Sequence, residues 1–203
     1  MGRQKYLTEV EQLFKKSPVI SAKSIERIIR NKKKVKQYTK QLIRRLILKG
    51  KLKRIGRGFY TAYDESSLAV FYFKPAYLGL QDALSFHNLW EQETIPVIIT
   101  TKKVRQGMRK INAENVWVRR INKKYLFGFD YFKEGDFYLP YSDIEKTLID
   151  MIYFKQRLSE EALRNFKKKI DKKKLKKYLE IYPPWFRKRV LKKYLNTEKS
   201  LKS

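Results

Sequence analysis

Positive charge is distributed unevenly along this chain, and this distribution limits its fold more than any other feature. Residues 1–62 carry 19 basic and 3 acidic side chains, residues 63–155 carry 13 and 12, and residues 156–203 carry 17 and 5. Compact basic modules attract phosphate backbones, whereas a neutral, aromatic-rich segment is suited to packing against protein. We therefore expect a basic domain over 1–62, a neutral domain for self-association or protein contacts over 63–155, and a basic helical tail over 156–203.

The chain has enough apolar residues to fold despite its net charge of +29. Hydrophobic residues make up 42% of its 203 residues and aromatic residues 14%, which excludes a disordered polycation. The lysine enrichment of hyperthermophile proteins is an alternative origin of the charge, but glutamate is not enriched to match. Cysteine is absent, so a disulfide scaffold and a thiolate metal site are excluded. The longest apolar run, Leu68–Phe73, is far shorter than the ~20 residues that cross a bilayer. We expect a soluble cytoplasmic protein that binds a polyanion and no membrane.

The first basic segment predicts three helices followed by a hairpin. Apolar spacing predicts helices over Gln4–Lys16 and Val35–Lys49, and Ser21 is suited to cap a helix between them. Alternating residues on both sides of the turn Gly56–Gly58 predict a β-hairpin. This order is typical of a winged helix-turn-helix, in which the third helix enters the DNA major groove and the wing lies along the backbone or minor groove.

One side of the third predicted helix presents long hydrogen-bond donors and no acid. Lys and Arg reach phosphates or guanine edges, and Gln can read adenine. The candidate nucleic-acid-binding residues of this segment are Lys33, Lys34, Lys36, Gln37, Lys40, Gln41, Arg44, Arg54 and Arg57.

The neutral segment mixes short apolar strands with two helices. Strands are predicted over 95–101 and 116–121, a hairpin over 126–139 and a helix over 80–89. Ser142 and Glu145 have the spacing of a capping box at the start of the second helix. We expect a small α+β domain with a mostly antiparallel sheet, and an α+β class for the whole chain.

Four short motifs carry a resemblance to a known family. They are Arg54–Tyr60, Tyr77–Leu89, Ile98–Arg105 and Asp143–Asp150, and they lie in the same order over roughly residues 5–195. Through them the chain resembles archaeal-like members of the AbiEi-type antitoxin and winged helix-turn-helix transcriptional regulator family. The resemblance implies a winged helix that binds promoter DNA and a C-terminal domain for autoregulation, antitoxicity or self-association, with no catalytic residues. The charge outside the winged helix is unusually high for an operon repressor.

The basic tail predicts three helices, each with an apolar stripe and a cationic back. Ser159 and Asp171 are suited to cap the first two, and Pro183–Pro184 interrupts the chain before the third. The tail is either a helical cap packed on the middle domain with solvated lysines or a second phosphate-binding surface. Binding to a membrane surface is a third possibility, but Tyr and Lys at these spacings favour packing and phosphate binding. The candidate residues for the phosphate-binding surface are Lys172, Lys173, Lys174, Lys176, Lys177, Arg187, Lys188, Arg189, Lys192 and Lys193.

Nothing in the sequence predicts an enzyme. It has no phosphate-cradling glycine loop, nucleophile elbow or two-histidine metal motif, and we expect no cofactor and no bound metal. The one histidine, His87, is expected to be buried or at an interface. Asp143, Glu145 and Asp150 could bind a metal, but helix capping accounts for the first two.

Three functions remain open. The leading one is a non-enzymatic winged-helix regulator or antitoxin that binds double-stranded DNA as a homodimer. The second is a ribosome-associated factor that binds rRNA on a ribosomal subunit and blocks or pairs subunits under stress. Binding of rRNA needs no helix that reads a groove. The third is a protein-interaction module that neutralises an acidic toxin.

Overall fold

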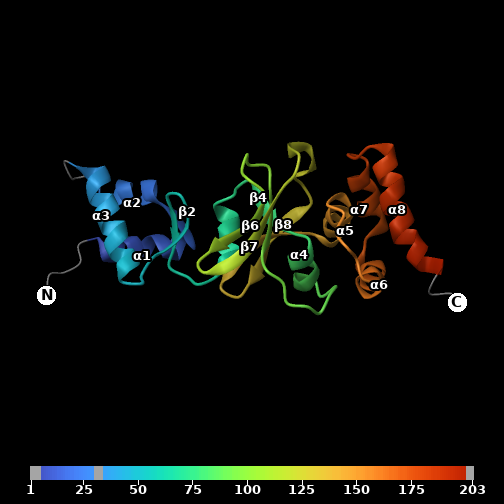
Figure 1. Cartoon of the computed structure of the whole chain (residues 1–203), viewed down its shortest axis with the longest axis horizontal. Coiled ribbons are helices and arrows are strands. Elements are labelled where there is room, and N and C mark those ends of the chain that lie inside the picture. Colours follow the sequence, from blue (N-terminus) through green and yellow to red (C-terminus); the bar gives the residue numbers. More distant parts are fainter. Residues whose placement is uncertain (1–5, 30–33, 200–203) are drawn as a thin grey trace. The chain divides into compact units, whose positions relative to one another are not determined.

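A computed structural model describes residues 6–29 and 34–199, and the side chains up to residue 194. The described residues form an α+β protein with a three-stranded antiparallel sheet and a six-stranded mixed sheet (Figure 1). They divide into two compact units. Unit 1 comprises the described residues up to Tyr72 together with Arg109–Asn115, and unit 2 comprises Phe73–Met108 and the residues from Val116 onward. Within the described ranges, no helix combines the length and the apolar character that a membrane span requires.

Unit 1 contains the three helices and the hairpin that its sequence predicts. Its elements are α1 (Leu7–Lys16), β1 (Val19–Ser21), α2 (Ala22–Ile28), α3 (Val35–Leu48), β2 (Lys53–Gly56), β3 (Phe59–Thr61) and the 3₁₀ helix η1 (Ser66–Phe71). The strands form an antiparallel sheet in the order β1-β3-β2. One apolar side of each helix faces a shared core, in which Val10, Ile25, Leu42 and Leu46 are almost completely buried. Full burial of such a side chain contributes about 1.5–3 kcal/mol.

Local signals set the ends of these helices. The Ser21 hydroxyl accepts a hydrogen bond of 3.1 Å from the backbone N–H of Ser24, so Ser21 caps α2 as predicted. Gly50 follows α3 with a φ of 68°, a left-handed conformation that glycine adopts without strain. The helix α3 therefore begins at Val35 as predicted and ends at Leu48, one residue before the predicted end. Lys33 lies outside the described residues.

The six-stranded sheet is mixed, with both antiparallel and parallel pairs, where the sequence predicted a mostly antiparallel one. Its strands are β4 (Ala76–Leu78), β5 (Val97–Thr100), β6 (Gly107–Ile111), β7 (Glu114–Arg120), β8 (Phe129–Glu134) and β9 (Phe137–Ser142), in the order β6-β7-β5-β4-β9-β8. The pairs β4–β5 and β8–β9 are antiparallel, whereas β4–β9 and β5–β7 are parallel. The short strand β4, which the sequence did not predict, lies between β5 and β9 and creates one of these parallel pairs.

The helices of unit 2 share one hydrophobic core with this sheet. They are α4 (Gln81–Phe86), the 3₁₀ helix η2 (Lys123–Tyr125), α5 (Ile144–Tyr153), α6 (Glu160–Lys169), α7 (Lys172–Leu179) and α8 (Pro184–Lys199). Tyr77 of β4, Leu148 of α5, Phe166 of α6, Leu179 of α7 and Val190 of α8 belong to the same buried cluster. The described helices of the basic tail are therefore packed into unit 2 on their apolar sides.

The cap of α5 lies one residue later than the sequence predicted. Asp143, and not Ser142, accepts a hydrogen bond of 2.8 Å from the backbone N–H of Lys146. Ser142 instead ends β9, and its hydroxyl lies 2.8 Å from the Thr147 hydroxyl. Glu145 does not reach back to the cap, because its carboxylate accepts the backbone N–H of Asp171 at 2.8 Å. The capping box is therefore replaced by a link between α5 and the start of α7.

Candidate nucleic-acid interface

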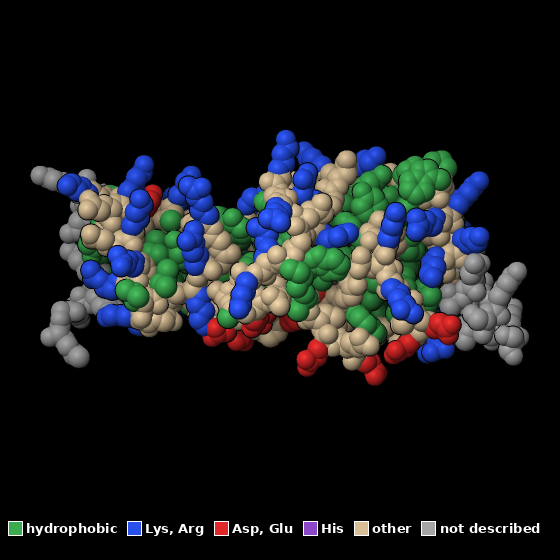
Figure 2. Space-filling model, in the orientation of Figure 1, with side chains coloured by type: hydrophobic (Ala, Val, Ile, Leu, Met, Phe, Trp, Pro, Cys, Tyr) green, Lys and Arg blue, Asp and Glu red, His purple; other side chains and the backbone are tan. Residues whose placement is uncertain are grey.

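Unit 1 contains a groove of about 450 Å³ between its helices and its hairpin. The side chains that line it come from α2, α3, β2, β3 and the turn between the two strands. They are Ala22, Glu26, Thr39, Lys40, Ile43, Arg44, Ile47, Leu48, Arg54, Arg57 and Tyr60, with Gly58 completing the rim. Figure 2 shows hydrophobic side chains framed by Lys and Arg side chains over α3 and β2.

The helix α3 presents its cations to this groove because its apolar side is used in the core. Leu42 and Leu46 are 5% and 2% exposed. Residues on the opposite side are exposed, and Lys36, Lys40 and Arg44 follow one another at intervals of four along one row of the helix. Lys40 and Arg44 line the groove. Lys34, Lys36, Gln37 and Gln41 are exposed but do not belong to its lining.

The hairpin contributes two more cations. Arg54 lies on β2 and Arg57 in the turn, and both are exposed and line the groove. The Arg54 Nε donates a hydrogen bond of 3.3 Å to the Gly56 carbonyl, which ties the guanidinium to its own strand. Gly56 has no space for a side chain, because a Cβ atom there would lie 2.6 Å from the ring of Tyr72. The neighbouring Lys53 does not join this group, since its ammonium pairs with Asp64.

Charge and shape therefore coincide in the groove. Four of its lining residues are Lys or Arg, and among the described residues that line it Glu26 is the single acid. The groove also has apolar lining residues: Ile43 is 6% exposed, whereas Ile47 is 38% and Leu48 78% exposed. The sequence pattern predicted only the cations of this site and did not include Ile47 or Leu48. Leu48 lies off the apolar stripe of α3, so the pattern gave it no role in the core either. A concave surface lined by cations and by exposed apolar side chains is suited to an anionic ligand that also has a hydrophobic face.

No family model matches this chain. No curated protein matches it either. The resemblance to the AbiEi-type family therefore stays a prediction that rests on its four motifs, and the groove is interpreted from its own residues.

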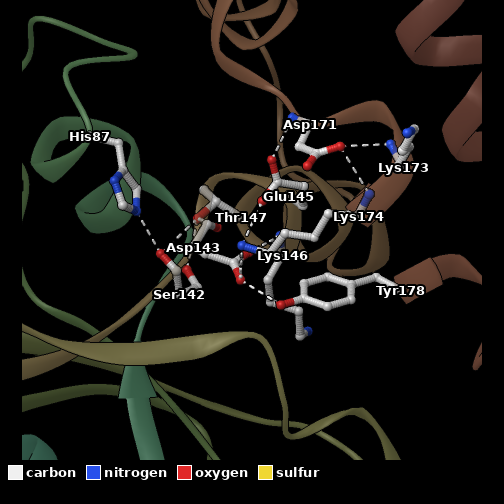
Figure 3. A network of polar contacts seen from close by, with 10 residues as sticks. All are labelled: His87, Ser142, Asp143, Glu145, Lys146, Thr147, Asp171, Lys173, Lys174 and Tyr178. Atoms are coloured by element: carbon white, nitrogen blue, oxygen red, sulfur yellow. Dashed lines mark hydrogen bonds and ion pairs between the residues drawn. The ribbon is translucent and has the colours of Figure 1, made fainter. Parts of the chain in front are cut away.

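The candidate cations of the tail fall into two groups. Exposed side chains on α7 and α8 are Lys172, Lys173, Lys176, Lys177, Lys188, Arg189, Lys192 and Lys193. Lys174 and Arg187 are partly buried and serve the fold. The Lys174 ammonium lies 3.1 Å from carboxylate oxygens of both Asp143 and Glu145 (Figure 3). The Arg187 guanidinium donates hydrogen bonds of 2.7 Å and 2.9 Å to the carbonyls of Tyr182 and Glu180.

The two carboxylates shift the ionisation of the residues around the start of α7. Burial lowers the pKa of Lys174, but the hydrogen bonds and attraction of Asp143 and Glu145 outweigh burial and raise it overall. The Tyr178 hydroxyl donates a hydrogen bond of 2.7 Å to Asp143, and burial together with this bond raises the pKa of Tyr178 to about 12. Lys174 therefore stays charged and bound to the two acids over the physiological range.

A buried polar network in unit 2 was not predicted from the sequence. Lys146 and Asp150 form an ion pair on α5, and the Tyr77 hydroxyl donates a hydrogen bond of 2.6 Å to Asp150. The Lys146 ammonium also lies 3.3 Å from the Tyr182 hydroxyl. Burial lowers the pKa of Lys146 and raises that of Asp150, although their mutual attraction opposes both shifts. Because none of these groups reaches the surface, the network holds α5 to the sheet and touches no solute.

His87 and the acids of α5 do not form a metal site. The His87 Nε2 lies 2.6 Å from the Ser142 carbonyl, and burial lowers the pKa of this imidazole. The neutral ring therefore donates this hydrogen bond. Asp143, Glu145 and Asp150 each have the protein partners described above, and no group of three or more metal-ligating side chains lies together within the described ranges.

Proposed function

We propose that the groove of unit 1 binds double-stranded DNA. In this proposal unit 1 is a winged helix-turn-helix domain, α3 is the recognition helix and the β2–β3 hairpin is the wing. The order α1-β1-α2-α3-β2-β3 and the exposed row of donors on α3 support this interpretation. Lys40 and Arg44 would meet phosphates or guanine edges, and Arg54 and Arg57 would follow the backbone.

The observation that carries the proposal is the composition of the groove. Lys40, Arg44, Arg54 and Arg57 line one concave surface with Glu26 as the only acid among its described residues. A solvated helix face of ordinary composition would mix both signs of charge. An interface for an acidic protein would need the cations but not the shape of a helix beside a hairpin. The proposed protein is not an enzyme and acts as a cytoplasmic regulator, or as an antitoxin-like repressor, with residues 63–155 joining two copies.

Duplex binding is tested with the full chain and a pair of matched double variants. Lys40→Gln with Arg44→Gln removes two cations from the groove, and Lys15→Gln with Lys16→Gln removes two exposed cations from α1, outside the groove. We expect the first variant to weaken binding to a labelled DNA duplex and to reduce the salt slope by about 1 for each lost contact, and the second to bind as the parent does.

The outcomes separate the three functions. Preference for the DNA duplex over an RNA duplex of the same sequence supports a groove-reading α3, because the A-form major groove is too narrow for side chains to read. Equal loss of affinity in both double variants, or affinity that is flat between 50 and 200 mM salt, contradicts the proposal. If DNA affinity does not change with salt and the protein still binds an acidic protein partner, the protein-interaction module would instead be favoured.

A ribosome-associated factor is the second candidate function, and one observation favours it. Lys172, Lys173, Lys176 and Lys177 are exposed on α7 and give unit 2 a basic surface of its own. A promoter-binding repressor needs no such surface. Sedimentation of the native protein through a sucrose gradient tests this candidate, since co-migration with ribosomal subunits that Lys172→Gln and Lys176→Gln abolish would favour rRNA over DNA.

A further inference from the structure

The first turn of α8 carries an exposed indole. Trp185 is 66% exposed, whereas the next residue, Phe186, is 3% exposed and anchored in the core of unit 2. The two ring centroids lie 5.7 Å apart in an edge-to-face arrangement, so the exposed ring packs against the buried one. Figure 2 shows hydrophobic side chains bordered by Lys and Arg side chains at the α7–α8 end of unit 2.

Cations continue the same face of α8 beyond the indole. Lys188, Arg189 and Lys192 follow Trp185 by three, four and seven residues, and all three are exposed. Residues at these intervals lie on one side of a helix. With a rise of about 1.5 Å per residue, the row from Trp185 to Lys192 is about 10 Å long.

This row leads into a pocket of about 340 Å³ between α8 and the end of α5. Arg189 and Lys192 belong both to the row and to the pocket lining. The other lining residues are Ile152, Lys155, Gln156, Leu158 and Lys193, and none of these lining residues, all within the described ranges, is acidic. Ile152 and Leu158 are 6% and 9% exposed and form an apolar floor. The pocket therefore attracts anions and has the size of a small-ligand site.

We propose that this surface of unit 2 binds a short stretch of single-stranded nucleic acid. Trp185 stacks on one unpaired base, and Arg189, Lys192 and Lys155 contact the phosphates that follow it. Aromatic stacking beside a cationic track is the way in which proteins hold unpaired strands. The proposal goes beyond duplex binding by unit 1 and uses none of its residues.

A membrane surface fits these residues less well. An interfacial helix needs a free apolar face with several large side chains. On α8 the apolar residues Phe186, Val190 and Tyr194 are already buried in the core, so that among the side chains described up to residue 194 the indole is the one large exposed apolar group. The cations and the stacked ring together match a nucleotide better than a lipid headgroup, which has no flat face.

The test compares two oligonucleotides that carry the same phosphates. One is a labelled single-stranded ten-nucleotide thymidine oligomer, and the other has an abasic site in place of every base. The protein is the full chain with all four groove cations replaced (Lys40→Gln, Arg44→Gln, Arg54→Gln and Arg57→Gln), so that the groove of unit 1 does not contribute and failure of the duplex proposal leaves the result unaffected. Binding is followed by fluorescence anisotropy at 50 mM salt.

We expect Trp185→Ala to weaken binding of the intact oligomer about 5- to 150-fold and to leave binding of the abasic oligomer unchanged. The affinity of Trp185→Phe, which keeps a ring, for the intact oligomer should lie between those of the parent and of Trp185→Ala. Arg189→Gln with Lys192→Gln should weaken binding of both oligomers. Tyr138→Ala, which removes an aromatic ring of unit 2 that is 62% exposed, is the control and should change neither.

Three results would overturn the proposal. The first is equal affinity of Trp185→Ala and its parent for the intact oligomer. The second is an equal loss of affinity for both oligomers in Trp185→Ala, which would mean that no base is stacked. The third is undetectable oligomer binding by the parent together with binding to vesicles of phosphatidylserine and phosphatidylcholine that Trp185→Ala abolishes, which would assign the surface to a membrane.

Discussion

Lys146 and Asp150 form an ion pair one helical turn apart on α5, and neither side chain has any exposed surface. The Lys146 ammonium lies 5.6 Å from the ring centroid of Tyr77 and 5.3 Å from that of Phe127. Removing one partner of a buried pair leaves the other charge uncompensated in an apolar surrounding. The stability of unit 2 therefore depends on both residues together.

We expect Asp150→Ala to lower the free energy of unfolding by about 3–5 kcal/mol, because the Lys146 ammonium would remain buried without its carboxylate. The double variant Asp150→Ala with Lys146→Met should lose less than the single variant, since it removes both charges. Denaturant unfolding followed by circular dichroism measures both values. Glu11→Ala, which breaks an exposed pair with Lys51, serves as the control and should cost at most about 1 kcal/mol. A double variant less stable than Asp150→Ala would contradict this account.

The wing arginines should affect binding through charge alone. Arg54→Gln with Arg57→Gln should lower affinity for a DNA duplex at 50 mM salt and reduce the salt slope by roughly 2, about one for each lost phosphate contact. Lys53→Gln lies on the same strand but removes a cation that is already paired with Asp64, so its slope should stay close to that of the parent. Titration of a labelled duplex at four salt concentrations gives all three slopes. An unchanged slope in the double arginine variant would remove the hairpin from the interface.

The cap of α5 should distinguish two variants of one residue. Asp143→Ala removes the acceptor for the backbone N–H of Lys146 as well as the partner of Tyr178, and we expect a loss of about 2 kcal/mol in stability. Asp143→Asn keeps a capping oxygen and should lose less than half as much. Thermal unfolding of the two proteins side by side makes the comparison, and equal melting temperatures would show that the cap contributes little.

His87 should make unit 2 sensitive to mild acid. Because burial lowers its pKa in the folded protein, the unfolded chain binds a proton at a higher pH than the folded one does. The stabilisation is fully present above the unfolded pKa of about 6.5 and is lost as the pH falls through the folded pKa. We expect the melting temperature to fall between pH 7.5 and pH 5, and His87→Gln, which keeps a nitrogen donor for the Ser142 carbonyl, to reduce that fall. A fall of the same size in both proteins would assign the acid sensitivity to other groups.

Short-range signals in the sequence predicted the helices well. Ser21, Ser159 and Asp171 cap α2, α6 and α7 as expected, because a capping oxygen bonds backbone groups only two or three residues away. The predicted cap of α5 was wrong by one residue, since Ser142 and Asp143 both carry an oxygen that can accept the hydrogen bond. The choice between them depends on where β9 ends, which is a property of the sheet.

Features that depend on contacts between residues far apart in the chain could not be predicted from the sequence pattern. All three residues of β4, Ala76–Leu78, are buried, so they show no alternation that marks a strand. In the sequence Lys146 looks like one more surface lysine. Only the structure shows that it is buried beside Asp150, Tyr77 and Tyr182. For the candidate site, the pattern gave the cations of α3 and the hairpin, but it could not place Leu48 beside them, because the groove exists only once the helix and the hairpin pack together.

The chain passes between its two units three times, after Tyr72, after Met108 and after Asn115. A gene fragment that stops at Tyr72 would encode the groove but omit Arg109–Asn115, which belongs to the same unit. A cut at this single position therefore does not separate the whole of unit 1 from unit 2.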